Sequence, residues 1–293
     1  MRYIVPTLIT DDMLMSSSVP EDDHPAWAAA TAYSLGERVI HGHSIYERLV
    51  AGTTATAPDG DAANWVRLGP TNRWAMLDGA VGTATQAIDE ITLVIRPGVV
   101  RGLALLDMDV ESVRVTMDVD GTTIYDTTIT PLATQEDCDE WYGYFFETIQ
   151  RRRVVTLNDL PPYGEGEITV TVQGTGLVSV GSLVVGVMYG LGDTLANPRI
   201  GIVDYSRKVT DDFGVVSVAQ RAYSRRMSLD VVMPTGAVDV ASSRLARVRA
   251  QPVVWVASER MDSLVVYGFV KDWSVSIPGR VMSTCSLEIE GLV

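Results

Sequence analysis

The residue types that most often carry out enzyme chemistry are present, but they do not form a catalytic pattern. Nucleophilic catalysis needs a Ser or Cys beside a base such as His. The three histidines, His24, His41 and His43, all fall in one short stretch, and the sequence has no G-x-S-x-G motif. Glycoside hydrolysis needs only two carboxylates at a set separation, so a glycan-depolymerising enzyme stays open as an alternative. No pair among the 37 acidic residues stands out, and we expect no catalytic residues.

Signals for a metal or cofactor site are equally weak. Cys138 and Cys285 lie far apart and lack a CxxC spacing, which argues against a zinc site. The stretch 118–121 (DVDG) partly matches a calcium loop but lacks the later ligands, so a hairpin turn at Asp120-Gly121 is the better interpretation. The glycine-rich stretch 186–192 matches neither nucleotide-binding pattern. We expect no metal and no cofactor.

Arginine and aromatic side chains give the best signal for a protein interface, because both are enriched at interaction hot spots. An aromatic cluster precedes the basic run 151–153, for which local pairing with nearby acids is the alternative interpretation. Further arginines lie in the last third of the chain, where phosphate binding is the alternative to docking on an acidic protein surface. The predicted assembly interface comprises Tyr3, Ile4, Trp141, Tyr142, Phe145, Arg225, Arg226, Arg244 and Arg247.

The net charge argues against a nucleic-acid partner for this chain. The 293 residues carry a net charge of −14, and binding to phosphates needs a basic face. Residues 1–70 hold 9 acids and 4 bases, residues 71–190 hold 17 and 7, and residues 191–293 hold 11 and 12. The acidity therefore belongs to the first two-thirds. No apolar run approaches the roughly 18 residues of a membrane span, and no signal peptide is expected.

The pattern of short alternating runs, which include 167–173, 178–189 and 215–219, predicts a mainly β chain with a small Trp/Tyr-rich module and a β-sandwich of jelly-roll type. An α+β domain with one helix on an antiparallel sheet completes it. The helix is expected over 241–250, with Asp239 as its N-cap and Pro252 preventing its continuation. A short helix is also expected within 134–150. The predicted parts are 1–23 (an extended N-terminal arm), 24–70 (the module), 71–190 (the sandwich) and 191–293 (the α+β domain).

Residues 27–69 resemble the small carbohydrate-binding modules of families five and twelve, which occur in chitinases and cellulases. Two positions depart from the family pattern: Glu37 replaces an Asp, and 48–51 (RLVA) replaces a Trp pair. The resemblance implies host-glycan binding by stacking, with a purely structural role as the alternative. The matching residues are Trp27, Tyr33, Gly36–Val39, Ile45, Tyr46, Pro58, Trp65 and Gly69, and the implied stacking residues are Trp27, Tyr33, Tyr46 and Trp65.

Three further segments, 1–21, 71–76 (TNRWAM) and 203–208 (VDYSRK), resemble bacteriophage virion proteins of the tail. The resemblance implies a non-enzymatic structural protein of the tail tip or baseplate, made in the host cytoplasm and located in the virion. Its implied partners are other tail proteins, copies of itself in a ring or trimer, and a host surface glycan. It further implies support of receptor-binding fibres.

Overall fold

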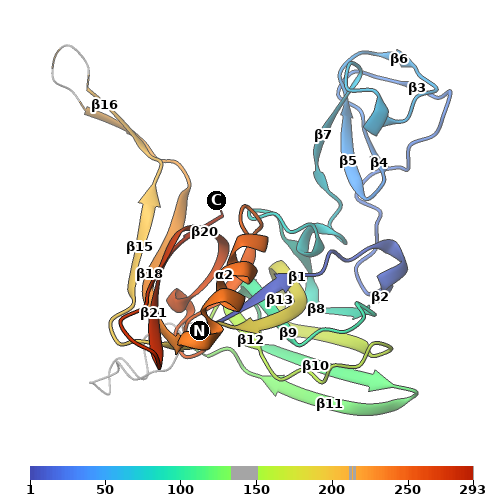
Figure 1. Cartoon of the computed structure of the whole chain (residues 1–293). Coiled ribbons are helices and arrows are strands. Elements are labelled where there is room, and N and C mark those ends of the chain that lie inside the picture. The colour runs from blue at the N-terminus through green and yellow to red at the C-terminus, as the bar shows by residue number, and fades with distance from the viewer. Residues whose placement is uncertain (133–150, 211–212, 214–215, 293) are drawn as a thin grey trace, which may run out of the picture.

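The computed structural model describes residues 1–132, 151–210, 213 and 216–292 (Figure 1). The fold is mainly β, with 55% of residues in strands and 9% in helices, as the sequence predicts. All pairs of named strands are antiparallel, and most of them belong to one 14-stranded sheet. Short 3₁₀ helices cover Asp11–Met13 (η1), Pro58–Gly60 (η2), Ala75–Leu77 (η3), Thr235–Ala237 (η4) and Asp262–Leu264 (η5).

The module of residues 24–70 projects from the main body in Figure 1. Inward-facing residues alternate along its central strand with outward-facing ones, as the twofold period of a strand requires. Its buried side chains are those of Tyr33, Val39, Tyr46 and Trp65. The strands are β3 (Ala32–Tyr33), β4 (Arg38–His41), β5 (Ser44–Arg48), β6 (Gly52–Thr53) and β7 (Trp65–Pro70), paired as β4-β5-β7 and β3-β6.

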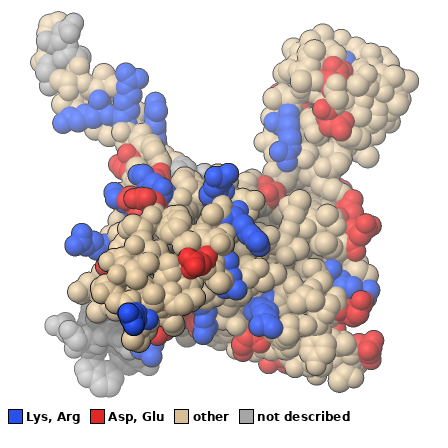
Figure 2. All heavy atoms as spheres, viewed as in Figure 1, with Lys and Arg blue, Asp and Glu red and all other residues tan. Residues whose placement is uncertain are grey.

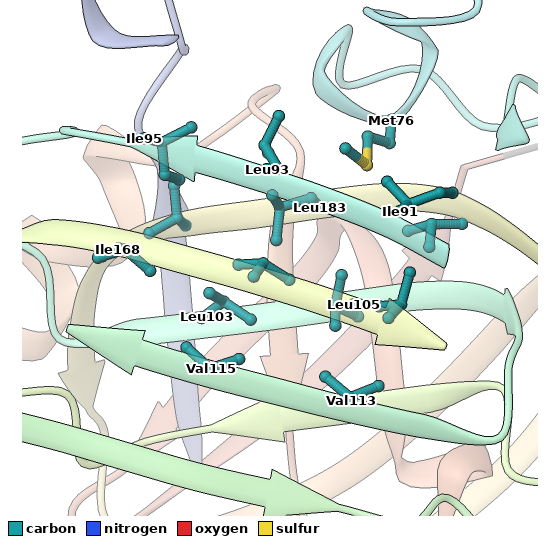
Figure 3. Close-up of a cluster of buried hydrophobic side chains, with 14 of the residues drawn as sticks. Met76, Ile91, Leu93, Ile95, Leu103, Leu105, Val113, Val115, Ile168 and Leu183 are labelled. Carbon is teal, nitrogen blue, oxygen red and sulfur yellow. The ribbon is translucent and has the colours of Figure 1, made fainter. Parts of the chain in front are cut away.

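A β-sandwich-like layer arrangement follows the module, and its centre is a single bent strand, β13 (Glu167–Gly190). The first half of β13 pairs with β8 and β10, and its second half pairs with β9. The register shifts between Gln173 and Leu177, where the strand turns so that its two halves bury side chains in one core (Figure 3). The other strands are β2 (Leu14–Ser17), β8 (Thr85–Ile95), β9 (Gly102–Asp109), β10 (Ser112–Val119), β11 (Thr122–Ile129) and β12 (Val154–Leu157).

The C-terminal part carries one α-helix, α2 (Val238–Arg247), against an antiparallel sheet. Val238, Ala241 and Leu245 point into its core. The helix begins three residues before the predicted start, so Asp239 lies in its first turn rather than at the N-cap. The sheet consists of β14 (Asp193–Thr194), β15 (Arg199–Asp204), β18 (Tyr223–Pro234), β19 (Val253–Val256), β20 (Val265–Ser276) and β21 (Met282–Gly291), and a separate hairpin contains β16 (Arg207–Thr210) and β17 (Val216–Ala219).

The N-terminal strand β1 (Arg2–Pro6) lies between β13 and β19 and joins both halves of the large sheet. Tyr3 and Ile4 are completely buried, so the prediction that they lie at an interface with another protein is wrong. Tyr3 stacks on Trp255 with ring centroids 5.0 Å apart, while Ile4 faces the opposite side of the strand. Pairing of β1 with a strand on each edge accounts for the burial. It gives hydrogen-bond partners to backbone N–H and C=O groups that would lack protein partners in an extended N-terminal segment.

The short helix predicted within 134–150 lies outside the described residues. Over the part of the chain that the structure describes, no helix has the length and apolar character needed to cross a bilayer.

Candidate assembly surface

A long β-hairpin, here termed the arm, projects from the C-terminal sheet and comprises residues 199–226 (Figure 1). At its base β15 pairs with the first part of β18, and farther out β16 pairs with β17. The described part of β15 has no strand on its outer edge. An unpaired strand edge offers backbone donors and acceptors to another chain.

The arm exposes an unusual number of apolar side chains. Every described residue of β16 and β17 is exposed to solvent. Scattered apolar residues are normal on a protein surface, but several together on one projecting element mark an interaction surface. Exposed apolar side chains of the arm include Ile200, Ile202, Val209, Val216, Val218 and Tyr223, of which Ile202 and Val218 are 63% and 67% exposed.

The arm is also basic within an acidic protein. Residues 199–226 contain six Lys and Arg against three Asp, and Figure 2 shows the blue atoms along the arm. Arg226 forms an ion pair with Glu288 at 2.6 Å. No described carboxylate lies within 4.0 Å of the other five bases, Arg199, Arg207, Lys208, Arg221 and Arg225. Their charge is therefore available to an acidic partner.

A shallow hollow of about 310 Å³ lies at the base of the arm, between Ile202, Tyr223 and Arg225 on one side and Asp262 on the other. Asp262 accepts a hydrogen bond from Arg152 at 2.7 Å. Arg151 pairs with Glu111 at 2.6 Å. These bases of the 151–153 run thus pair with acids distant in sequence.

The predicted interface arginines divide between two places. Arg225 and Arg226 lie in β18 at the base of the arm. Arg244 lies over the ring of Tyr189, 4.9 Å from its centroid, and Arg247 is exposed near the end of α2. The aromatic residues Trp141, Tyr142 and Phe145 lie outside the described residues.

The aromatic residues that the resemblance assigns to sugar stacking are mostly core residues. Tyr33, Tyr46 and Trp65 are only 6%, 8% and 2% exposed, so their faces are not open to a sugar. Arg48, itself 2% exposed, covers Trp65 with its guanidinium 4.9 Å from the ring centroid. A module of fewer than 50 residues needs its large side chains for its own core. Only Trp27 is partly exposed, and it meets the ring of His41 edge-on.

A second hollow, of about 140 Å³, lies between the sandwich and the C-terminal sheet. Ser182 lines it and donates its hydroxyl hydrogen to the backbone oxygen of Ala80 at 3.1 Å. Tyr267 donates to Gly79 at 3.1 Å, and burial is the main cause of the raised pKa of Tyr267. Both hydroxyl groups are therefore engaged in hydrogen bonds to backbone oxygens of the segment 79–80. Among the described residues, no group of three or more His, Cys, Asp or Glu is placed to hold a metal ion.

The predicted interface leaves out the apolar residues of the arm and four of its bases, Arg199, Arg207, Lys208 and Arg221. Their only signal in the sequence is a pair of alternating stretches, 200–203 (IGIV) and 215–218 (VVSV), without a partner pattern that would bury them. No family model matches this sequence, and neither does any curated protein.

Proposed function

We propose that the chain is a structural protein of a bacteriophage tail tip or baseplate, which joins tail components through the arm. The observation that carries the proposal is the projecting hairpin with exposed apolar side chains, five bases that have no described carboxylate within 4.0 Å, and an open strand edge. The resemblance of three segments to tail proteins supplies the phage context. The remaining body supports the arm and, in this proposal, receptor-binding fibres; no catalysis is proposed.

A second copy of the chain is the partner that the charges favour. The arm has a net charge of +3, whereas residues 71–190 have a net charge of −10. Opposite charges steer the encounter and fix its register, and removal of apolar side chains from water supplies the affinity. The acidic sandwich of one copy therefore receives the arm of the next.

Analytical ultracentrifugation of the full chain tests the partner. We expect self-association that weakens as sodium chloride rises from about 50 mM to 500 mM, because exposed charges are screened over shorter distances at high salt. The double variant R207E/K208E should remain monomeric. Arg280, which is exposed and has no described ion-pair partner, provides the control R280E, which should associate like the original chain. A monomer at all concentrations and salt levels would exclude the self-docking.

Mass spectrometry of purified virions tests the phage role separately. We expect the chain among the tail proteins, and cryo-microscopy should place the arm against a neighbouring subunit. Absence from purified virions would overturn the tail assignment, whatever the ultracentrifugation shows. Glycan recognition is the alternative that the module implies. Three of its four implied stacking residues are buried in the module core, and no specific observation supports this function.

A further inference from the structure

A single histidine lies where the module meets the main body. His43 occupies the tight turn between β4 and β5, with a φ of 60°. Its Nε2 atom lies 2.8 Å from a carboxylate oxygen of Asp11, and its Nδ1 atom lies 2.9 Å from a carboxylate oxygen of Glu21. Asp11 belongs to η1 and Glu21 to the segment that leads into the module. One ring thus connects three segments of the chain.

The two contacts determine the protonation of the ring. An ionised carboxylate only accepts hydrogen bonds, and a neutral imidazole has only one N–H to donate. Both contacts are therefore hydrogen bonds only when His43 is the doubly protonated imidazolium. Loss of one proton would leave a nitrogen lone pair facing a carboxylate at hydrogen-bond distance, which is repulsive.

The surroundings of the ring strengthen this arrangement. Trp74 stacks on it with centroids 4.4 Å apart, and the backbone oxygen of His43 accepts the N–H of Thr71 at 2.9 Å. Glu21 has a side chain only 17% exposed and accepts the Thr71 hydroxyl hydrogen at 2.9 Å. Arg73 lies 4.0 Å from Glu21 and, among the described residues, is the only other basic side chain within that distance of it. The junction is thus a small network with Glu21 on its buried side and Asp11, whose side chain is 68% exposed, on its solvent side.

The same network shifts the proton affinity of the histidine. Burial disfavours the charged ring, but the hydrogen bonds and negative charges of Asp11 and Glu21 outweigh it and raise the pKa of His43 above 6.5. Arg73 lies 4.0 Å from Oε2 of Glu21, an oxygen that is also 3.2 Å from Nδ1 of His43, so the Arg73 charge faces the same carboxylate.

We propose that His43 is a proton-controlled clamp that fixes the 24–70 module to the main body. The clamp is closed when both ring nitrogens carry hydrogen. It opens when the ring loses a proton, and the module then moves about its two connections near residues 22–24 and 70–72. This inference is independent of the proposed function, because it concerns contacts within one chain.

The direction of the pH dependence follows from the raised pKa. A group that binds its proton more tightly in the closed state stabilises that state fully below its ordinary pKa of 6.5. The contribution is lost as the pH rises through the raised value. The module is therefore held at acidic pH and released at alkaline pH.

¹⁵N relaxation of the full chain measures the effect directly. At pH 5.5 the module should tumble with the main body, and at pH 8.5 it should show a shorter rotational correlation time. Cleavage by a protease near residues 22–24 should rise roughly tenfold or more between the two pH values, the effect of losing a charge-assisted hydrogen bond.

Two variants separate the clamp from a general loss of folding. H43N keeps a residue type that tolerates the left-handed turn but removes the imidazole ring, and D11A removes the carboxylate while leaving the turn untouched. Both should show the mobile module at pH 5.5. H41Q is the matched control, since His41 contacts only Asp59 among the described acids and should follow the original chain. A correlation time that does not change with pH, or one that changes equally in H43N, would overturn the proposal.

Discussion

The buried N-terminal strand gives the sharpest test of the fold. Ile4 has no exposed surface and lies among the apolar residues of β9, β13 and β19. Truncation of a buried Ile to Ala costs about 2–5 kcal/mol, depending on how well the site collapses. If residues 1–23 were instead an extended, solvent-exposed segment, the same substitution would leave the free energy of unfolding almost unchanged. We therefore expect I4A to lower the free energy of unfolding by about 2–5 kcal/mol, and L8A, at a residue 71% exposed, to change it by less than about 0.5 kcal/mol.

Substitution of Gly102 together with Ile4 provides a double-mutant cycle for the same contact. A Cβ atom at Gly102 would lie 2.9 Å from Cγ1 and 3.0 Å from Cδ1 of Ile4, and 2.8 Å from the terminal carbon of Met188. Overpacking of this kind costs about 1–3 kcal/mol. I4A removes both crowded atoms of Ile4, while the Met188 side chain is flexible enough to move. G102A should therefore cost less in the I4A background, with a favourable coupling of about 0.5–3 kcal/mol.

Urea unfolding of the full chain, followed by tryptophan fluorescence, measures all four proteins of the cycle. Equal slopes of the unfolding free energy against urea concentration would show that all four proteins expose the same surface area on unfolding. The reasoning would be refuted by an I4A cost below about 1 kcal/mol. Strict additivity of the two substitutions would refute the proposed contact between Ile4 and position 102.

Two further predictions concern the same interior. G186A should abolish cooperative unfolding in a thermal melt, because its Cβ would collide with the backbone oxygen of Val5 and prevent β1 from pairing. G176A, at the register shift of β13 with a φ of 85° and no atom within 4 Å of the added Cβ, is strained but leaves the core intact. Burial raises the pKa of the Cys285 thiol to about 11, so in a C138S background iodoacetamide at pH 8 should label Cys285 only after unfolding, and rapid labelling of the native chain would contradict its burial.

Local sequence signals predicted the local parts of the fold. The Asp120-Gly121 turn is a two-residue hairpin in which both residues have positive φ, as expected from the preference of these residue types. The alternation in 167–173 and 178–189 predicted two strands. The structure joins them into the single strand β13, which bends at its glycines rather than ending there.

Long-range pairing could not be predicted in the same way. β1 is five residues long, and the residues of β13 and β19 with which it pairs lie 180 or more residues away in the sequence. Nothing within the stretch RYIVP distinguishes a strand that completes a sheet from one that docks on a neighbour. The choice depends on two edges that exist only after the rest of the chain has folded.

In the candidate sites, too, the sequence predicted local patterns but not which segments meet in space. A Trp/Tyr pattern at this spacing suits either a sugar platform or a small core, and burial of Tyr33, Tyr46 and Trp65 decides for the core. The strand pattern of 215–219 was predicted, but its exposure was not, because alternation alone does not say what covers a strand. The His43 clamp required three segments to meet in space.

The distribution of ion pairs changes the meaning of the nearly neutral last third of the chain. Of the seven bases in 71–190, five pair with described carboxylates, namely Arg73, Arg96, Arg114, Arg151 and Arg152. Three of these ion pairs lie within 71–190, whereas Arg73 and Arg152 pair with Glu21 and Asp262 outside it, and the segment keeps an excess of acids. In the arm, by contrast, only one of six bases, Arg226, has a described carboxylate partner. Without the arm's net +3, the rest of 191–293 is also acidic, at −2. Of the segments compared, only this projecting hairpin has a net positive charge, and we expect the proposed association through it to weaken as the salt concentration rises.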